Sequence, residues 1–302
     1  MKWVILGIIV TVVTIIVIFF KPAEKVRLLT KYYLNPCPFS SPKKQTDFPI
    51  YLEDFDIEQY YNNLLAFKDD FDYQTLATVS YADKSYPVYK ITLKNSGEGN
   101  KLLIISATHG NEFATALVIP KLLEDISENK DFYKGWEIEI ITPANPVGLV
   151  HQSRYNETGC DINRDFNEYR TIGAGVQRDV IEEFKPDVIV TMHESFREGF
   201  FVIAEQNTVK EFEQALARDL QAADIDLGNK SILGLPLSIK GISRKSMLTM
   251  WLQRVFNINT LGMYAHELGI TTLTTESPWT SSDVEARIKP HLITVKSVVS
   301  NY

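Results

Sequence analysis

The sequence predicts an α/β fold: a mixed, mainly parallel central sheet with helices on both faces, preceded by an N-terminal transmembrane helix. Its short strands are apolar throughout, as in KLLIIS at 101–106, which is typical of strands buried on both faces. Segments with helical periodicity separate them, which favours parallel pairing. The run from Trp3 to Phe20 is uncharged and 18 residues long, enough to cross the hydrocarbon core of a bilayer as a helix.

These patterns divide the chain into a transmembrane anchor at residues 1–22, a linker at 23–49 and a folded domain at 50–302. Residues 35–49 of this linker are rich in Pro, Ser and Lys, which is typical of a spacer between membrane and folded domain. A cleaved secretory signal is the alternative for the first part, although the KPAEK that follows Phe20 is a poor cleavage site.

The orientation of the anchor follows from two opposing signals. Several Lys and Arg residues follow the apolar run and only Lys2 precedes it, so the positive-inside rule favours a cytoplasmic body. Single-span proteins with a very short amino tail often place the body outside. We therefore expect a single-pass, membrane-anchored protein with its folded domain on the extracytoplasmic side.

The composition excludes some classes of function. A formal net charge of −7 and a pI near 5.4 provide no basic surface to neutralise phosphates, so we expect no nucleic-acid partner. The two cysteines, Cys37 and Cys160, are too few for a Cys-only zinc site. They either pair in an oxidising compartment or remain separate thiols, and the sequence leaves both open.

The elements of the folded domain are expected in the following order. A helix at 54–67 precedes a hairpin over 73–95, and the strand at 101–106 leads into a helix at 113–126 that Pro120 kinks or restarts. Further strands are expected at 136–145, 187–193, 200–205 and 271–276, and further helices at 208–223, 244–256, 260–268 and 282–300.

Polar residues follow or end four of these strands: His109, Asn145, His193 and Glu276. In an open α/β sheet, binding sites form outside the carboxyl ends of the strands. We therefore expect these four side chains to face one cleft.

His109 and Glu112 lie three residues apart, just after the strand at 101–106. Catalytic zinc sites use about three nitrogen or oxygen ligands and leave one position open, and His193 would supply the third ligand from a neighbouring strand. Gly110 would relieve backbone crowding between the pair. The alternative is an exposed loop in which Glu112 is only a carboxylate favoured at a helix N-terminus.

Two further features could take part in chemistry: an arginine-bearing loop that suits a substrate with a free carboxylate, and Glu276. Arg154, Asn163 and Arg164 lie in the polar stretch RYNETGCDINRDF, and arginine binds carboxylates through two parallel hydrogen bonds. The alternative is a surface loop with ordinary ion pairs. Glu276 ends an otherwise uncharged strand, where it could act as a general base or pair with an arginine at the sheet edge.

Taken together, these motifs resemble the zinc carboxypeptidase superfamily, which includes the related succinylglutamate desuccinylase and aspartoacylase family. The resemblance covers about residues 70–300. The motifs that carry it, in chain order, are HGNE at 109–112, Asn145-Pro146, Arg154, DINRDF at 161–166, His193 and Glu276.

The resemblance implies a zinc carboxypeptidase-like catalytic domain at 50–302 that binds one Zn²⁺ per chain. The implied metal ligands are His109, Glu112 and His193. The implied catalytic residues are Glu276, as the general base, and Arg154, which polarises the scissile carbonyl and stabilises the oxyanion. The implied substrate-binding residues are Asn163 and Arg164, with Asp161 expected to brace their loop.

Two features of the sequence depart from the patterns of these families. The sequence therefore does not decide between the carboxypeptidases and the desuccinylases and aspartoacylases. Digestive carboxypeptidases carry a capping tyrosine some twenty residues before the catalytic glutamate, and SMLTMWLQRVFN has none; Tyr264 is expected to pack within a helix. Only 26 residues follow Glu276, too few for the additional β domain of desuccinylases and aspartoacylases. The loop from Arg154 to Arg164 nevertheless resembles the aspartoacylase side.

The resemblance predicts a zinc-dependent hydrolase that cleaves an amide bond adjacent to a free carboxylate, a carboxypeptidase-type metallopeptidase acting on peptides. The alternatives are a deacylase of N-acyl amino acids, an inactive peptide-binding module, and a deacylase of ester-linked or sugar-linked groups. We expect structural or exposed roles for the other histidines and consider Arg197 a candidate for tuning specificity. These histidines are His151, His266 and His291.

Overall fold

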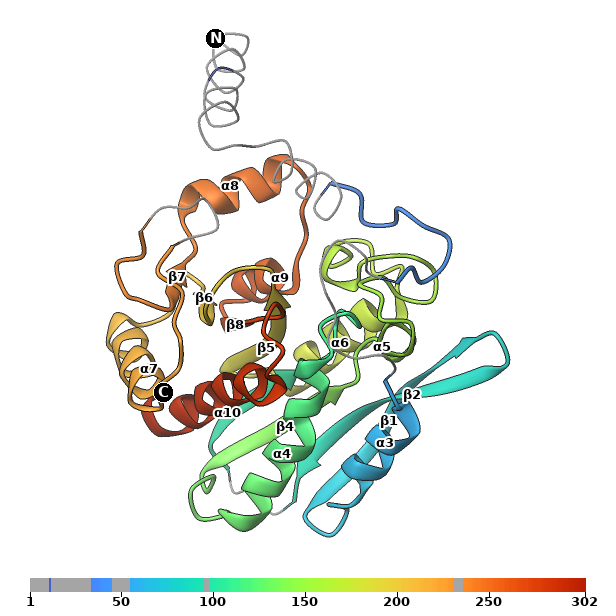
Figure 1. The fold of residues 1–302 in the computed structure, drawn as a ribbon, viewed down its shortest axis with the longest axis horizontal. Coiled ribbons are helices and arrows are strands. Elements are labelled where there is room, and N and C mark those ends of the chain that lie inside the picture. The colour runs from blue at the N-terminus through green and yellow to red at the C-terminus, as the bar shows by residue number, and fades with distance from the viewer. Residues whose placement is uncertain (1–10, 12–33, 45–54, 95–97, 231–235) are drawn as a thin grey trace.

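The computed structural model describes residue 11 and residues 34–44, 55–94, 98–230 and 236–302 (Figure 1). None of the helices formed by these residues is both long enough and apolar enough to span a bilayer. The expected transmembrane run from Trp3 to Phe20 lies, apart from Thr11, outside the described residues.

An eight-stranded sheet forms the centre of the fold, in the order β1-β2-β4-β3-β5-β8-β6-β7. Its inner strands β4, β3, β5 and β8 run parallel, whereas β2 joins β4 and β6 joins β8 in antiparallel fashion. The expected mixed sheet is therefore confirmed. The strands are β1 (Phe71–Tyr81), β2 (Lys84–Leu93), β3 (Asn100–Ile105), β4 (Trp136–Thr142), β5 (Val188–Ser195), β6 (Phe201–Ala204), β7 (Ile242–Arg244) and β8 (Thr271–Pro278).

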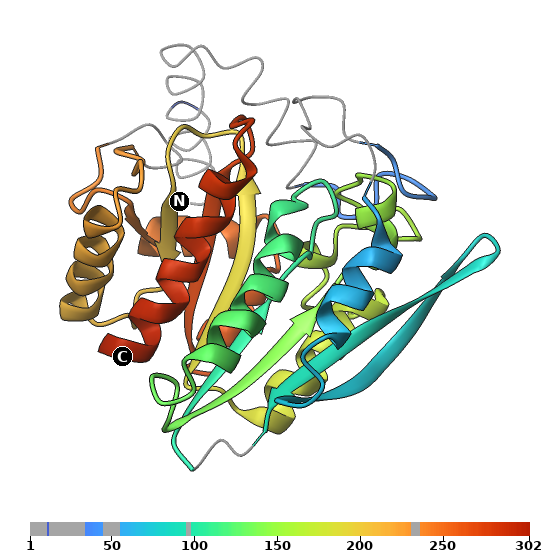
Figure 2. The ribbon, with the colours of Figure 1, turned by 60° about the horizontal axis from the view of Figure 1, so that its bottom comes forward.

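Helices cover both faces of this sheet, as expected. Figure 2 shows α10, α4 and α3 side by side on one face. The helices are α3 (Ile57–Leu65), α4 (Ala114–Glu128), α5 (Pro146–Val150), α6 (Ile172–Phe184), α7 (Lys210–Ala222), α8 (Met247–Val255), α9 (Leu261–Glu267) and α10 (Val284–Asn301).

The chain changes direction across the sheet at β3. It passes from β3 through α4 to β4 on one side, and then through α6 to β5 on the other side. Because such crossovers are right-handed, α4 and α6 lie on opposite faces. Residues 102–105 of β3 are completely buried between these layers. In open α/β sheets, ligands bind at such a reversal, outside the carboxyl ends of the strands, which here are those of β3 and β5.

The sequence located most elements and missed three. The structure adds α5, α6 and β7, and α4 continues through Pro120 without a restart. α6 begins IGAG, and glycine is a poor helix former, so the sequence pattern there is weak. The structure explains Gly173, because a Cβ atom there would come within 2.5 Å of the Ile162 side chain.

His291 fastens α10 to β8. It is completely buried, its Nδ1 lies 2.7 Å from Thr275 Oγ1, and its Nε2 lies 3.0 Å from Ser277 Oγ. Burial, with smaller contributions from the charges of His193 and Arg287, lowers the pKa of His291 to about 3, and Glu112 opposes this change. The histidine expected to be structural is therefore a neutral hydrogen-bonding link.

We predict that this link makes the fold acid-sensitive. Between its pKa of about 6.5 in the unfolded chain and about 3 in the folded one, His291 binds a proton only after unfolding. The free energy of unfolding should therefore fall by up to about 1.4 kcal/mol per pH unit as the pH decreases through this window. Urea denaturation from pH 7.5 to 4.5 should show a shallower decline for His291→Asn than for the parent protein.

His151→Asn is the control for this measurement, because His151 is exposed at the end of α5. This variant also loses an imidazole, but from a position that makes none of the hydrogen bonds between α10 and β8. Parallel declines for the parent and His291→Asn would contradict the assignment of this acid sensitivity to His291.

Candidate metal centre

The turn between β3 and α4 carries His109 and Glu112, and it packs tightly against α5. A Cβ atom on Gly110 would come within 1.8 Å of the Gly148 carbonyl carbon, and Gly110 N donates to Ser153 O at 2.8 Å. Gly110 therefore allows close backbone approach to α5, rather than only relieving crowding within the HGNE stretch. This contact fixes the turn from which both side chains project.

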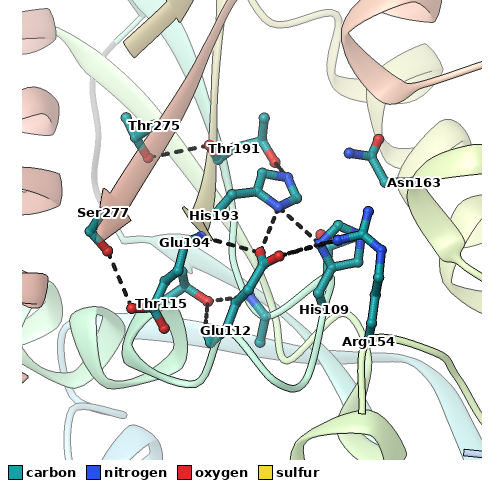
Figure 3. Close-up of polar contacts among 12 residues, drawn as sticks. His109, Glu112, Thr115, Arg154, Asn163, Thr191, His193, Glu194, Thr275 and Ser277 are labelled. Atoms are coloured by element: carbon teal, nitrogen blue, oxygen red, sulfur yellow. Dashed lines mark hydrogen bonds and ion pairs between the residues drawn. The ribbon is translucent and has the colours of Figure 1, made fainter. Parts of the chain in front are cut away.

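Three side chains converge at this turn (Figure 3). Glu112 Oε1 lies 2.8 Å from His109 Nδ1, and Glu112 Oε2 lies 2.8 Å from His193 Nδ1. The two Nδ1 atoms are 3.2 Å apart, and all three side chains are buried. Within the described parts of the chain, this is the group of His, Cys, Asp or Glu side chains whose ligand atoms lie close enough to hold a metal ion.

The chemistry of these donors fits a cation. His109 Nε2 lies 3.0 Å from Asp161 Oδ1, and when this nitrogen carries the proton and donates it, the Nδ1 lone pair faces Glu112. A lone pair of His109 and the Glu112 carboxylate then face each other in a buried space, and a cation held between them and His193 Nδ1 would offset their repulsion. Two nitrogens and one carboxylate oxygen are also a ligand set of catalytic zinc sites.

The electrostatics of Glu112 agree with a ligand role. Burial alone would raise the pKa of Glu112, but the charges and hydrogen bonds of His109 and His193 outweigh burial and lower it. Burial lowers the pKa of His193, although Glu112 opposes this. Glu112 is therefore held as a carboxylate, the form that binds metal ions.

Asp161 connects this group to Arg154. Its Oδ2 accepts a hydrogen bond from Arg154 Nε at 2.8 Å, while Oδ1 lies against His109. Burial opposes ionisation of Asp161, but the charges of Arg154, His109 and Arg164 outweigh burial and lower its pKa. Asp161 was expected only to brace the loop. The structure shows that it also orients an imidazole, as carboxylates behind metal-binding histidines do.

Arg154 lies directly beside the convergent group. Its Nη1 is 3.4 Å from Glu112 Oε1 and 3.3 Å from His109 Nδ1. The bond from Nε to Asp161 fixes the guanidinium plane, and the side chain is 12% exposed. A positive charge is thus held at the edge of the site with partial access to solvent.

Glu276 lies on β8 directly across from His193 on β5 and Phe201 on β6. Paired residues of neighbouring strands present their side chains on the same face of a sheet. Desolvation and the nearby charge of Glu112 raise the pKa of Glu276, although Arg154, Arg197 and Arg164 oppose this. Glu276 thus belongs to the same site as the three convergent side chains but differs from Glu112 in its tendency to hold a proton.

The two expected carboxylate-binding residues have different surroundings. Asn163 Oδ1 accepts a hydrogen bond from Leu261 N at 3.0 Å, which fixes its amide near Arg154 (Figure 3). Arg164 Nη1 donates to Asn163 O at 2.7 Å, and Arg164 also lines a separate cavity of about 190 Å³ with Leu34 and Phe256. Asn163 therefore faces the site more directly than Arg164 does, while the charge of Arg164 still acts on Glu276.

The other polar residues considered from the sequence lie around this site or away from it. Asn145 caps α5 by accepting from Gly148 N and donates to Thr108 O, so it shapes the turn. The Arg197 guanidinium stacks 3.8 Å from the centre of the Phe201 ring, next to Glu276 in the sheet. His151 and His266, which lie in the loop after α5 and in α9, are not among the convergent donors.

A buried ion pair that the sequence did not reveal supports the site from behind. Arg287 of α10 donates to both oxygens of Glu194 at 2.7 and 2.9 Å, and both side chains are almost completely buried. Glu194 Oε2 also accepts from Ala114 N at 3.0 Å, which caps α4 where its N-cap residue makes no side-chain bond. Glu194 N in turn donates to Glu112 Oε2 at 3.2 Å.

A disulfide joins Cys37 to Cys160, which resolves the two alternatives left by the sequence in favour of pairing. It fastens residues 34–44, hereafter the strap, onto the loop at 153–161. Pro36 O accepts from Asp161 N at 2.6 Å, and the rings of Phe39 and Tyr155 pack edge to face at 5.0 Å. Part of the expected linker therefore packs against the loop that carries Arg154 and Asp161.

Comparison with known proteins agrees with this geometry. The sequence profile of the succinylglutamate desuccinylase/aspartoacylase catalytic domain matches residues 98–194. No curated protein sequence matches the chain.

Solved structures share the fold at low sequence identity. A candidate metallopeptidase from Shewanella denitrificans is 17% identical, with a TM-score of 0.66 over 84% of this chain and 98% of that chain. A metallo-carboxypeptidase from Burkholderia cenocepacia is 17% identical, with a TM-score of 0.64 over 82% and 69%. A metallo-carboxypeptidase from Pseudomonas aeruginosa, in complex with (2-guanidinoethylmercapto)succinic acid, is 14% identical, with a TM-score of 0.57 over 82% and 69%.

We predict that Arg287→Met destabilises the fold by about 3–5 kcal/mol, because it leaves the Glu194 carboxylate buried without its partner. Urea denaturation at pH 7.5 measures this loss. Arg254→Met is the matched control, since the Arg254–Glu267 pair is 3.7 Å apart and mostly exposed, and its loss should cost less than about 1 kcal/mol. Similar losses in the two variants would show that the buried pair is not a structural anchor.

Proposed function

We propose that this chain, which has the fold of the zinc carboxypeptidases, is a metal-dependent hydrolase that cleaves an amide bond adjacent to a free carboxylate. The profile match and the shared fold of the solved metallo-carboxypeptidases confirm the predicted resemblance to this superfamily. The observation that carries the proposal is the convergence of His109, Glu112 and His193 beside Arg154 and Glu276.

We propose that one Zn²⁺ ion per chain occupies the convergent group. The three donors suit this ion, and Asp161 would keep His109 in the tautomer that presents Nδ1. When bound, a zinc ion supplies Lewis acidity that polarises the substrate carbonyl and favours ionisation of water. The remaining roles belong to side chains of this chain.

Glu276 is the proposed general base. A carboxylate with a raised pKa accepts a proton from the attacking water and returns it readily to the leaving nitrogen. Arg154 is the proposed partner of the oxyanion, because its guanidinium is already fixed by Asp161 and faces the same space. Asp161 therefore orients both His109, a proposed metal ligand, and Arg154, the proposed partner of the oxyanion.

The proposed substrate is a peptide with a free terminal carboxylate, bound by Asn163 and Arg164. The Pseudomonas aeruginosa structure contains a succinic acid derivative, and the solved carboxypeptidases align over most of this chain. The match of residues 98–194 to the desuccinylase and aspartoacylase profile keeps an N-acyl amino acid as the second candidate. An inactive binding module is disfavoured, because the ligands, Arg154 and Glu276 are all present together.

We further propose that the domain is anchored by residues 1–22 and lies on the extracytoplasmic side of a membrane. The Cys37–Cys160 disulfide supports this location, because disulfides persist in oxidising compartments. A cell-wall or extracellular peptide would then be within reach of the site.

We predict that Glu276→Gln lowers kcat by a factor on the order of 10²–10⁴, because the variant cannot accept the proton. The metal content of the purified full chain, measured by elemental analysis, should remain one zinc per chain. Glu267→Gln, an exposed residue of α9, should retain full turnover. A parent protein without bound metal after zinc supplementation would refute the proposal.

We predict that Arg164→Met raises KM for a peptide with a free terminal carboxylate by about 10- to 100-fold, through loss of a charged hydrogen bond. The C-terminally amidated peptide should be a poor substrate for both proteins, with little difference between them. A panel of peptides and N-acyl amino acids, assayed with zinc supplied, separates the two substrate candidates. An equal KM change for the acid and the amide would exclude carboxylate recognition by Arg164.

A further inference from the structure

The helix α8 exposes most of its large apolar side chains. Met247 is 77% exposed, Leu248 60%, Val255 56% and Trp251 45%. Met250 is its one buried residue. The helix is nevertheless well defined at its start, because the Ser246 hydroxyl accepts a hydrogen bond from Thr249 N at 3.1 Å.

These four side chains form a continuous stripe along α8. Positions i, i+1, i+4 and i+8 of a helix with 3.6 residues per turn fall within an arc of about 100°. A surface helix ordinarily turns such an apolar arc toward the protein core. Phe256, which is 51% exposed, extends the apolar surface beyond the last turn. A contiguous exposed apolar surface marks a site of interaction.

We propose that this stripe, Met247, Leu248, Trp251 and Val255, docks onto the surface of a lipid bilayer. The first argument is the position of α8 relative to the amino-terminal end of the chain. Leu34 and Pro36 of the strap line the same cavity as Phe256 and Asn257, which directly follow α8. Leu34, where the strap begins, therefore lies close to the end of α8. The sequence before Leu34 leads back to the uncharged run at residues 3–20.

The second argument is the length of chain that intervenes. Thirteen residues separate Phe20 from Leu34, and they span at most roughly 45 Å when fully extended. With residues 3–20 across a bilayer, as in the anchor proposed above on which this inference rests, Leu34 would lie within that distance of the membrane surface, and Phe256 at the end of α8 lines the same cavity as Leu34. The exposed apolar stripe would then meet lipid at a high effective concentration.

The third argument is the composition around the stripe. Trp251 is an amphipathic side chain of the kind that favours the bilayer interface. Arg254 borders the arc, is 59% exposed and lies 3.7 Å from Glu267, and the sequence between Phe20 and Leu34 contains Lys21, Lys25, Arg27 and Lys31. Basic residues beside an apolar helical stripe favour anionic headgroups. The partner that fits this surface is therefore a bilayer that contains anionic lipid.

Docking at α8 would fix the orientation of the candidate active site. The chain that follows α8 contacts the segment at 163–166: Asn259 O accepts from Phe166 N at 3.4 Å, and Leu261 N donates to Asn163 Oδ1 at 3.0 Å. Figure 1 shows α8 at one end of the molecule, opposite the turn between α4 and β4. The site would then face substrates close to the membrane surface.

The experiment uses the full chain in vesicles of phosphatidylcholine and phosphatidylglycerol. Because Cys37 and Cys160 are paired, a new cysteine is the single free thiol among the residues of this sequence and accepts an environment-sensitive fluorophore. Labels at Leu248→Cys and Val255→Cys should lose at least threefold in emission when the vesicles contain nitroxide-labelled lipids. A label at Phe132→Cys, an exposed residue between α4 and β4, should be unaffected.

Two outcomes would overturn the proposal. Labels on α8 that respond to aqueous iodide but not to nitroxide lipids would show that the stripe faces water. Labels protected from both quenchers would show that protein covers the stripe, either a second copy or residues 3–20 of the same chain. Circular dichroism of each labelled variant verifies that the fold is retained, so a lack of quenching is attributable to the position of α8.

Discussion

The contacts of three buried side chains, His109, Glu112 and His193, are the constraint on which the rest of the site depends. These side chains place possible ligand atoms within 4.8 Å of one another in a buried space, an arrangement that could hold a metal ion. The surrounding residues hold these three side chains in place. Asp161 holds one imidazole, Glu194 N holds the carboxylate, and Arg287 fixes Glu194 through two hydrogen bonds. These contacts thus keep three possible metal ligands close together.

The same low-dielectric environment assigns different roles to two nearby carboxylates. Glu112 lies between two imidazoles, whose charges outweigh the effect of burial and lower its pKa. Glu276 lacks such partners, and desolvation and the charge of Glu112 raise its pKa. Pairs of carboxylates whose pKa values move in opposite directions are typical of sites that divide ligand binding from proton transfer. The proposed roles therefore follow from the neighbours of each side chain, although the two residues have the same chemistry.

The sequence predicts the residues of the candidate site, but it does not predict the buried contacts that hold those residues in place. His109, His193 and Glu276 could be placed together because each lies near or just after the carboxyl end of a predicted strand, and the sheet topology brings those ends to one edge. Glu194 and Arg287 are 93 residues apart, and neither lies in a pattern that indicates the other. Asp161 was visible in the DINR stretch, but its bond to His109 depends on how two loops pack. Long-range pairs of this kind carry no local signal.

The strap connects the surface of the molecule to the candidate metal centre. Cys37 is bonded to Cys160, and the adjacent Asp161 donates its backbone N–H to Pro36 while its side chain contacts His109 and Arg154. At its other end, Leu34 borders the cavity beside Phe256, next to the apolar stripe of α8. A displacement of the strap would therefore reach Asp161 through a covalent bond and a hydrogen bond. The segment that looks like a spacer in the sequence thereby becomes part of the framework that orients His109.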